Sequence, residues 1–299
     1  MISSRSAISG EAVASHYDDL DHFYRDVWGD HVHHGPWLRG DETRAQAVRQ
    51  LAELVAQRAL ITPEGLVSAG PANLDLQKRV PAAVCDIGCG YGATARLLAD
   101  RGADVTGVTI SSAQHAVAHE RNAGAANPQF CLGDWLTNEM PSDSFDAAIA
   151  IESSEHMPDL SAFFAQAHRV LRPGGRLVVC AWLAAEVPGA FATRWLLEPI
   201  CREGRMPQMG NASDYRSLGE AAGFRLEQFE DITRNVARTW PAIVRRLVVK
   251  FATQPRYLRF LFSPHQSNRI FGVTILRIWI AYRVGAMKYG VFTFVKKLD

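Results

Sequence analysis

Short apolar runs alternate with segments of helical periodicity between residues 80 and 182. This alternation is typical of a parallel β-sheet whose strands are connected by helices. It predicts five strands, at residues 81–88, 104–110, 129–135, 144–153 and 176–182. The last run, RLVVCAW, is almost continuously apolar, as expected of a strand that is buried on both faces. The pattern therefore predicts an open α/β sheet.

Helices are predicted between these strands at residues 94–102, 111–123 and 163–175. The first should face the sheet with Leu97 and Leu98 and end at Gly102. The second begins with a serine cap, and the third should end at Pro173 and the two glycines after it. Before the sheet, residues 42–60 have helical periodicity as well.

The pattern continues beyond residue 183 in a different form. A helix followed by a sixth strand is predicted within 217–233, and a last strand at 289–298, antiparallel at the sheet edge. Between them, the segment 240–288 mixes arginine and lysine with large apolar residues at helical spacing, broken at Pro255 and Pro264. We expect this insert to form a helical cap that packs on the core.

Composition excludes several classes of protein. The chain has 299 residues, 47% of them hydrophobic, which is enough for one enlarged domain. Its 32 basic and 31 acidic residues give a net charge of +1, so no global field attracts nucleic acid. The first ten residues lack the charged start and apolar core typical of a signal peptide, and no run reaches roughly 18 apolar residues, so we expect a cytoplasmic protein. The five cysteines match no zinc spacing, so no metal is expected.

Candidate chemistry begins with VCDIGCGYG, residues 84–92. A strand that runs through a glycine-rich turn into a helix presents backbone N–H groups at the carboxyl edge of a parallel sheet, where ligands bind. A phosphate cradle would need a lysine followed by serine or threonine, which is absent here. The glycines are spaced G-x-G-x-G rather than G-x-G-x-x-G, and Asp86 precedes the first of them by two residues. The spacing alone is a weak signal.

The ordered set of this turn, GDW at 133–135 and FDAAIAIES at 145–153 resembles the class I S-adenosylmethionine (SAM)-dependent methyltransferases over residues 80–182. The resemblance implies a seven-stranded Rossmann-like sheet that binds SAM. It assigns Asp86, Gly88 and Gly90 to the pocket for the methionine part, and Asp134 to the adenine amine. Trp135 would pack on the adenine ring, and Ile151 would line the same site. The alternatives are a turn cap for Asp86 and an ordinary core position for Trp135.

One departure from the general family pattern is informative. Most members end the second strand with an acid that holds the ribose, whereas this chain reads GVTISSAQ, with Thr109 and Ile110 at that place. This reading resembles the subgroup of cyclopropane-fatty-acid synthases and sterol and tocopherol methyltransferases. Gln114 then becomes the candidate ribose ligand.

Two further stretches, residues 17–37 and 152–160, resemble the γ-tocopherol methyltransferase branch, which includes plant indole-alkaloid N-methyltransferases and bacterial tailoring enzymes. Tyr17 would close over the amino-acid end of the cofactor. The histidines at 31, 33 and 34 could chelate a metal, but the family context favours a lid loop with hydrogen-bonding rings. The resemblance thus divides the chain into an N-terminal helical lid segment (1–75), a SAM-binding core (76–239), the cap insert (240–288) and a last strand (289–299).

Methyl transfer is an in-line displacement that needs an aligned nucleophile and, for carbon or protonated nitrogen, a base. Glu155 and His156 follow the fourth strand at the edge where the methyl group should point, and could supply an orienting acid and a base. Their alternatives are a helix cap and a packing position. Glu152 is a weaker candidate for the same role.

We therefore predict a SAM-dependent methyltransferase that methylates carbon in a prenyl, terpenoid or sterol-like acceptor. One alternative is N- or O-methylation of an alkaloid or glycosylated product, and another is a SAM-binding protein without catalysis. The partner is a lipophilic small molecule, and the inner face of the cap insert should line its pocket. The basic outer face of the insert could contact a membrane surface. The sequence makes no prediction of an oligomeric state.

Overall fold

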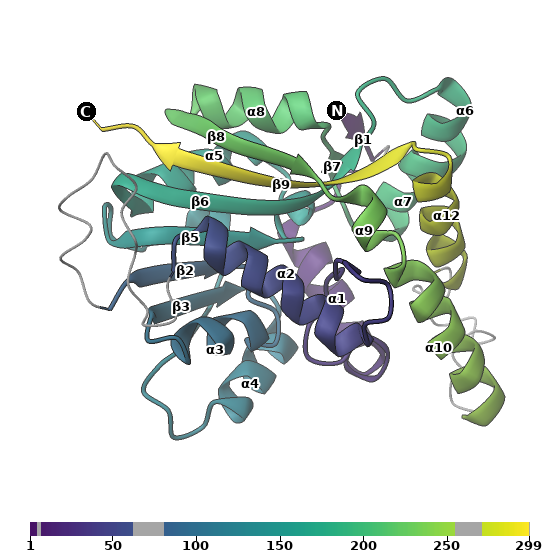
Figure 1. Ribbon diagram of the computed structural model, residues 1–299, viewed down its shortest axis with the longest axis horizontal. Coiled ribbons are helices and arrows are strands. Elements are labelled where there is room, and N and C mark those ends of the chain that lie inside the picture. Colours follow the sequence, from purple (N-terminus) through teal and green to yellow (C-terminus); the bar gives the residue numbers. More distant parts are fainter. Residues whose placement is uncertain (5–6, 62–80, 255–270, 299) are drawn as a thin grey trace.

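A computed structural model describes residues 1–4, 7–61, 81–254 and 271–298. Its centre is a seven-stranded sheet in the order β4-β3-β2-β5-β6-β9-β8 (Figure 1). The strands are β2 (Ala83–Ile87), β3 (Asp104–Thr109), β4 (Gln129–Leu132), β5 (Phe145–Ile151), β6 (Leu171–Ala184), β8 (Phe224–Asp231) and β9 (Met287–Lys296). Strands β2 to β6 are parallel, which confirms the predicted core of the sheet.

The last strand differs from its predicted place. β9 is antiparallel, as expected, but it lies between β6 and β8 rather than at the sheet edge. Nearly every residue of β9 is buried, whereas every residue of β8 after Phe224 is exposed or half-buried. The edge position is therefore wrong, because the more polar strand takes it.

Helices cover both faces of this sheet, as a parallel sheet requires. On one face lie α5 (Leu160–Val170) and α8 (Ala212–Ala221), packed against the phenylalanines of β9. The other face is covered by α2 (Arg44–Arg58) and α3 (Ala93–Ala99), with α4 (Ser112–Arg121) beside them (Figure 1). α1 (Gly10–Val27) lies over the carboxyl ends of the strands instead. α5 ends at Val170, before the expected stop at Pro173. A proline disfavours helical geometry in the residue before it, and here the chain enters β6 instead.

Within residues 7–61, the N-terminal segment forms the two helices α1 and α2. Ser9 caps α1 through the backbone N–H of Ala12, and Thr43 forms a capping box with Gln46 at the start of α2. Short elements that the sequence pattern did not predict complete the chain. They are the two-stranded sheet of β1 (Ile2–Ser3) and β7 (Gln208–Met209), α6 (Ala190–Ala192), the π-helix η4 (Thr193–Leu197), α7 (Glu198–Glu203) and α9 (Thr233–Val236).

The cap insert begins with α10 (Thr239–Thr253) and ends with α12 (Phe271–Arg283), which stand beside one end of the sheet (Figure 1). Its predicted breaks at Pro255 and Pro264 lie outside the described residues. α10 exposes Val248 and Val249 next to exposed arginines, a combination that is compatible with the predicted membrane contact. That contact stays a prediction. Within the described part of the chain, no helix has the length and apolar character needed to cross a membrane.

Candidate active site

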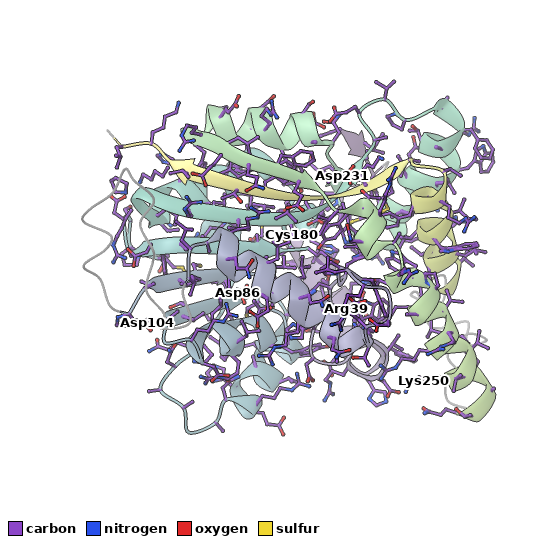
Figure 2. All side chains as sticks on the ribbon, in the orientation of Figure 1. Arg39, Asp86, Asp104, Cys180, Asp231 and Lys250 are labelled. Atoms are coloured by element: carbon purple, nitrogen blue, oxygen red, sulfur yellow. The ribbon has the colours of Figure 1, made fainter. Side chains whose placement is uncertain are left out.

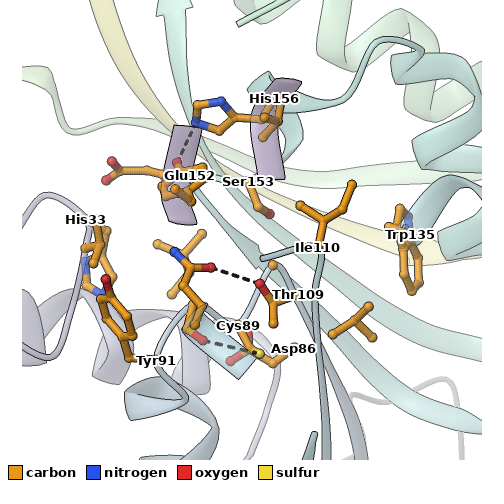
Figure 3. A pocket seen from close by; sticks show the side chains of 18 of the residues that line it. His33, Asp86, Cys89, Tyr91, Thr109, Ile110, Trp135, Glu152, Ser153 and His156 are labelled. Atoms are coloured by element: carbon orange, nitrogen blue, oxygen red, sulfur yellow. Dashed lines mark hydrogen bonds between the residues drawn. The ribbon is translucent and has the colours of Figure 1, made fainter. Parts of the chain in front are cut away.

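A cavity of about 1000 Å³, including space open to solvent, lies at the carboxyl ends of β2, β3 and β5. Parallel α/β sheets bind ligands at this edge. The structure brings into its lining all ten residues that the sequence assigned to the cofactor. They are Tyr17, Asp86, Gly88, Gly90, Thr109, Ile110, Gln114, Asp134, Trp135 and Ile151. Figure 3 shows Asp86, Cys89 and Thr109 together, with Glu152, Ser153 and His156 across from them.

The glycines of the turn serve two different purposes. Gly88 and Gly90 both have positive φ angles, +77° and +54°, which favour glycine. A Cβ atom on Gly88 would lie 2.3 Å from Cβ of Ser153, so this glycine lets β2 and the end of β5 approach each other. A Cβ atom on Gly90 would meet no heavy atom of the described residues within 4 Å. Gly90 therefore borders open cavity that a ligand can occupy.

Asp86 is a buried carboxyl group in the wall of this cavity, within the body of the molecule (Figure 2). Among the described residues, its Oδ2 atom has no hydrogen-bond partner. Burial raises the pKa of Asp86 to about 7, and the backbone N–H of Ala95 opposes this only in part. The site thus holds a carboxyl group without a countercharge, which fits a ligand that brings a positive charge.

Thr109 and Gln114 form the part of the wall that the sequence connected with the ribose. The Thr109 hydroxyl donates to Oε1 of Gln114 at 2.9 Å, and both side chains are buried. Because the amide oxygen is taken in this way, Gln114 offers a ligand its N–H donors. Oγ of Ser111 accepts the backbone N–H of Gln114, which fixes the start of α4.

Asp134 and Trp135 combine local structural contacts with a place in the cavity. Oδ1 of Asp134 accepts the backbone N–H of Leu136 and caps the short 3-10 helix η2 (Trp135–Thr137). Trp135 is packed in the core, and its indole N–H donates to the backbone oxygen of Phe163 at 3.3 Å. Both residues nevertheless line the cavity, with Trp135 beyond Ile110 in Figure 3.

Helix α1 covers the cavity and is fastened to α4. Asp18 accepts hydrogen bonds from the hydroxyls of Ser111 and Ser112 and from the backbone N–H of Ala113. Burial acts to raise the pKa of Asp18, but these hydrogen bonds lower it. At the start of α1, a Cβ atom on Gly10 would lie 3.1 Å from Ile110. The lid helix therefore contacts the strand ends directly.

A second cavity, of about 600 Å³, adjoins the first. The two share Tyr17, Val32, Glu152 and His156 in their linings. The remaining residues of the second lining are Tyr24, Trp28, Glu155, Trp182, Ile200, Gly204, Met206, Trp240, Thr274 and Ile278. Three of these come from the cap insert, so α10 and α12 contribute to this cavity. Phe260, another residue of the insert, lies outside the described residues.

Tyr17 and His156 form a hydrogen-bonded pair at the junction of the two cavities. Nδ1 of His156 lies 3.2 Å from the backbone oxygen of Arg205, which can only accept, so Nδ1 carries the proton. Nε2 is then the acceptor for the Tyr17 hydroxyl, at 2.9 Å. Burial lowers the pKa of His156 and raises that of Tyr17, so both groups are neutral near pH 7. The Nε2 lone pair of neutral His156 therefore accepts the Tyr17 hydroxyl at the junction.

Glu155 does not orient His156, in contrast to the sequence-based expectation. It lines the second cavity only, and its carboxyl group accepts the backbone N–H of Trp182 and the hydroxyl of Ser154. Burial raises the pKa of Glu155 to about 8, although the Trp182 N–H favours the charged form. Glu155 is thus mostly protonated at neutral pH, which disfavours a role as proton acceptor there.

Glu152, the weaker candidate from the sequence, is the ionised carboxylate of the site. Its Oε1 accepts from the backbone N–H of His34 (2.6 Å), from His34 Nδ1 (3.0 Å) and from the Tyr289 hydroxyl (2.7 Å). Oε2 accepts the indole N–H of Trp182 at 2.7 Å. Burial acts to raise its pKa, but His34 outweighs this and the pKa is lowered to about 2. The φ angle of Glu152 is +52°, uncommon outside glycine, so its neighbours hold it in place.

The other lid histidines bond mainly to one another. Nδ1 of His31 lies 3.1 Å from Nε2 of His33, and Nδ1 of His33 lies 2.7 Å from the backbone oxygen of His34. Burial lowers the pKa of His33 and, to about 3, that of His31. In the part of the chain that the structure describes, no group of three or more histidine, cysteine and acidic side chains could hold a metal ion.

Comparison with known proteins agrees with this geometry. Residues 85–179 match the family model described as a methyltransferase domain. The chain is 30% identical over 298 residues to the chloroplastic tocopherol O-methyltransferase of Arabidopsis thaliana, covering 96% of this chain and 82% of the relative. It is 28% identical over 303 residues to the 2-methyl-6-phytyl-1,4-hydroquinone methyltransferase of Synechocystis, covering 99% and 91%. The cyclopropane synthase MmaA2 of Mycobacterium tuberculosis has a similar fold, with a TM-score of 0.75, 21% identity and coverage of 98% and 100%.

The fold and the cavity at the strand ends define a class I methyltransferase architecture. The chain belongs to the class I SAM-dependent methyltransferases, in the branch that the sequence motifs indicated. It is a SAM-dependent methyltransferase, and this confirms the predicted cofactor. The Oδ2 atom of Asp86, which has no partner among the described residues, and the open space at Gly90 fit a cationic ligand without phosphate.

Proposed function

We propose that the enzyme transfers the methyl group of SAM to a lipophilic small molecule in the second cavity, at a carbon of a prenyl, terpenoid or sterol-like acceptor. The observation that carries this proposal is the shared wall of the two cavities. Tyr17, Glu152 and His156 line both, so a cofactor in the first cavity and an acceptor in the second would meet there. The similarity to tocopherol and phytyl-hydroquinone methyltransferases supports an acceptor of this kind.

In this proposal, residues of the first cavity hold the cofactor. Asp86 attracts its positively charged amino group, Gly90 leaves room for its methionine part, and Gln114 donates hydrogen bonds to its ribose. Asp134 faces its adenine amine. When bound, SAM supplies an electrophilic methyl group to a nucleophile aligned with the sulfonium.

In this proposal, His156 and Tyr17 remove a proton from the acceptor. After an alkene or aromatic carbon has taken up the methyl group, the acceptor must lose a proton. Nε2 of His156 can take that proton through the Tyr17 hydroxyl, because the two are 2.9 Å apart and His156 is neutral. The Arg205 carbonyl stabilises the charge that His156 then acquires, since it already accepts from Nδ1.

The same base supports a second candidate function, N- or O-methylation of an alkaloid or glycosylated product. A neutral histidine beside the transfer point can deprotonate a hydroxyl or an ammonium group before transfer. The two functions differ in the methylated atom, which the product of the reaction identifies.

The test uses SAM with a labelled methyl group and lipophilic extracts as the source of acceptor. His156→Ala should lower turnover by about a hundredfold or more, the range for loss of a positioned base, with the dissociation constant of S-adenosylhomocysteine nearly unchanged. His119→Ala, an exposed histidine on α4 outside both cavities, is the control and should retain full activity. Loss of cofactor binding in step with rate would instead assign His156 to the cofactor site, and full activity would exclude it as the base.

A further inference from the structure

Trp240, at the start of α10, places a hydrogen-bond donor without a partner in the wall of the second cavity. The side chain is 2% exposed, and its Nε1 atom contacts no acceptor among the described residues. An indole N–H can only donate, and leaving it unpaired in a buried place is unfavourable. By contrast, the indole N–H of Trp182, which lines the same cavity, donates a hydrogen bond to Glu152.

The aromatic cluster around Trp240 contains two more polar atoms of this kind. The Trp240 ring lies 5.2 Å from the ring of His34, which lies 5.7 Å from that of Tyr282. Nε2 of His34 and the hydroxyl of Tyr282 are buried and lack partners within the described part of the chain. Of these three residues, Trp240 belongs to the lining of the second cavity, so its N–H is the donor that a ligand there could use.

The charge of the lining restricts what that atom can be. Glu152 is ionised, and Glu155 adds a second carboxyl group, whereas the described lining contains no lysine or arginine. An anionic group in this cavity would be repelled by Glu152, and His34, whose Nδ1 lies 3.0 Å from Oε1 of Glu152, is already paired with that carboxylate. The free donor on Trp240 must therefore serve an uncharged acceptor atom.

Building on the proposed function, we propose that Trp240 selects an uncharged, oxygen-bearing lipophile. Its N–H donates to a hydroxyl, ether or carbonyl oxygen of the acceptor, while Glu152 rejects phosphate, diphosphate and carboxylate forms of the same skeleton. Trp240 is then a specificity-determining residue that contacts the substrate away from the Tyr17–His156 pair.

The experiment compares three probes with one carbon skeleton: geraniol, the corresponding deoxygenated diene, and geranyl diphosphate. Binding is measured by calorimetry on enzyme saturated with S-adenosylhomocysteine. We expect geraniol to bind at least tenfold more tightly than the diphosphate. Trp240→Phe keeps an aromatic ring and removes the N–H. It should therefore weaken the binding of geraniol about threefold to tenfold, as expected for the loss of one neutral hydrogen bond. Binding of the diene should not change.

Trp279→Phe is the matched control, because Trp279 lies on α12 outside the lining of both cavities and its ring is covered by Arg283. It should change the binding of neither geraniol nor the diene. Equal weakening of geraniol and the diene by Trp240→Phe, diphosphate binding as tight as that of geraniol, or no binding of geraniol would each overturn the inference. The comparison of probes on the unmodified enzyme remains decisive even if the variant does not fold.

The same measurements separate this inference from the proposed function. Methyl transfer to a phosphorylated lipophile would refute the selectivity and leave methyl transfer to a lipophile intact. Selective binding of geraniol without transfer to any lipophilic acceptor would refute the proposed function and leave the selectivity of the cavity intact.

Discussion

The substitution Asp86→Asn tests whether a buried, unpaired carboxyl group prepares the first cavity for a cationic ligand. Burial raises the pKa of Asp86 from 3.8 to about 7 in the folded enzyme without ligand. Asparagine has nearly the same shape and cannot ionise. The variant therefore removes the titration and keeps the packing.

The difference of about three pKa units corresponds to about 4 kcal/mol, at 1.36 kcal/mol per unit. Below pH 3.8 the carboxyl is protonated in both the folded and the unfolded state, so it makes no difference to stability. As the pH rises toward 7, the unfolded chain releases the proton and the folded enzyme retains it, which lowers the free energy of unfolding. Between pH 4 and 8, Asp86→Asn should gain about 4 kcal/mol of stability relative to the unmodified enzyme.

Urea denaturation of the ligand-free protein at several pH values measures this difference. Asp104→Asn is the control, because Asp104 is an exposed acid on β3, and it should show no such trend. A difference between Asp86→Asn and the unmodified enzyme that stays constant with pH would refute the reasoning, since Asp86 would then titrate normally.

Cofactor binding gives a second readout of the same group. A positive charge near Asp86 lowers its pKa, so binding of S-adenosylhomocysteine should release a proton below pH 7. The affinity should then rise up to about tenfold per pH unit toward pH 7 and level off above it. For Asp86→Asn it should be weaker and independent of pH. His31 and His156 do not interfere above pH 6.5, because burial lowers the pKa of both.

Two further substitutions test other parts of the site. Gly90→Val should weaken the binding of S-adenosylhomocysteine at least a hundredfold, as measured by calorimetry, because the side chain would enter the open cavity. Gly124→Val is the control and should leave binding unchanged, because Gly124 also has a positive φ angle and open surroundings but lies outside that cavity. Glu155→Gln should retain turnover within about threefold at pH 7, because Glu155 is mostly protonated there. It should also remove the loss of stability that builds up between pH 4.5 and about 8, where the unfolded chain releases the proton and the folded enzyme retains it. A hundredfold loss of turnover at pH 7 would restore Glu155 as a base.

The residues of the first cavity could be predicted from sequence because each belongs to a local pattern at a strand end. Asp86, Thr109 and Asp134 each lie at or near the end of a segment that the sequence marks as a strand. In a parallel sheet these ends meet at one edge, so three separate local predictions combine into one site. The position of α1 over this edge follows from the resemblance rather than from a local pattern. Asp18 provides the hydrogen bonds that hold α1 there.

The orientation of His156 could not be predicted in this way. Its two ring nitrogens bond to Tyr17, which lies 139 residues away, and to the backbone oxygen of Arg205. A backbone carbonyl has no signature in the sequence. The sequence alone favours Glu155, the neighbour of His156, as its hydrogen-bond partner. The structure instead turns Glu155 toward the Trp182 backbone.

Glu152 shows why the place of the last strand matters for function. Ile151, just before it, pairs with Cys180 of β6, and two residues further along β6, Trp182 pairs with Tyr289 of β9. Because of this register, the Trp182 indole and the Tyr289 hydroxyl both reach the Glu152 carboxylate. With β9 at the sheet edge, beyond β8, Tyr289 would not lie beside β6 and Glu152 would lose a donor. The position of β9 inside the sheet therefore helps to keep an ionised carboxylate at the point where the two cavities meet.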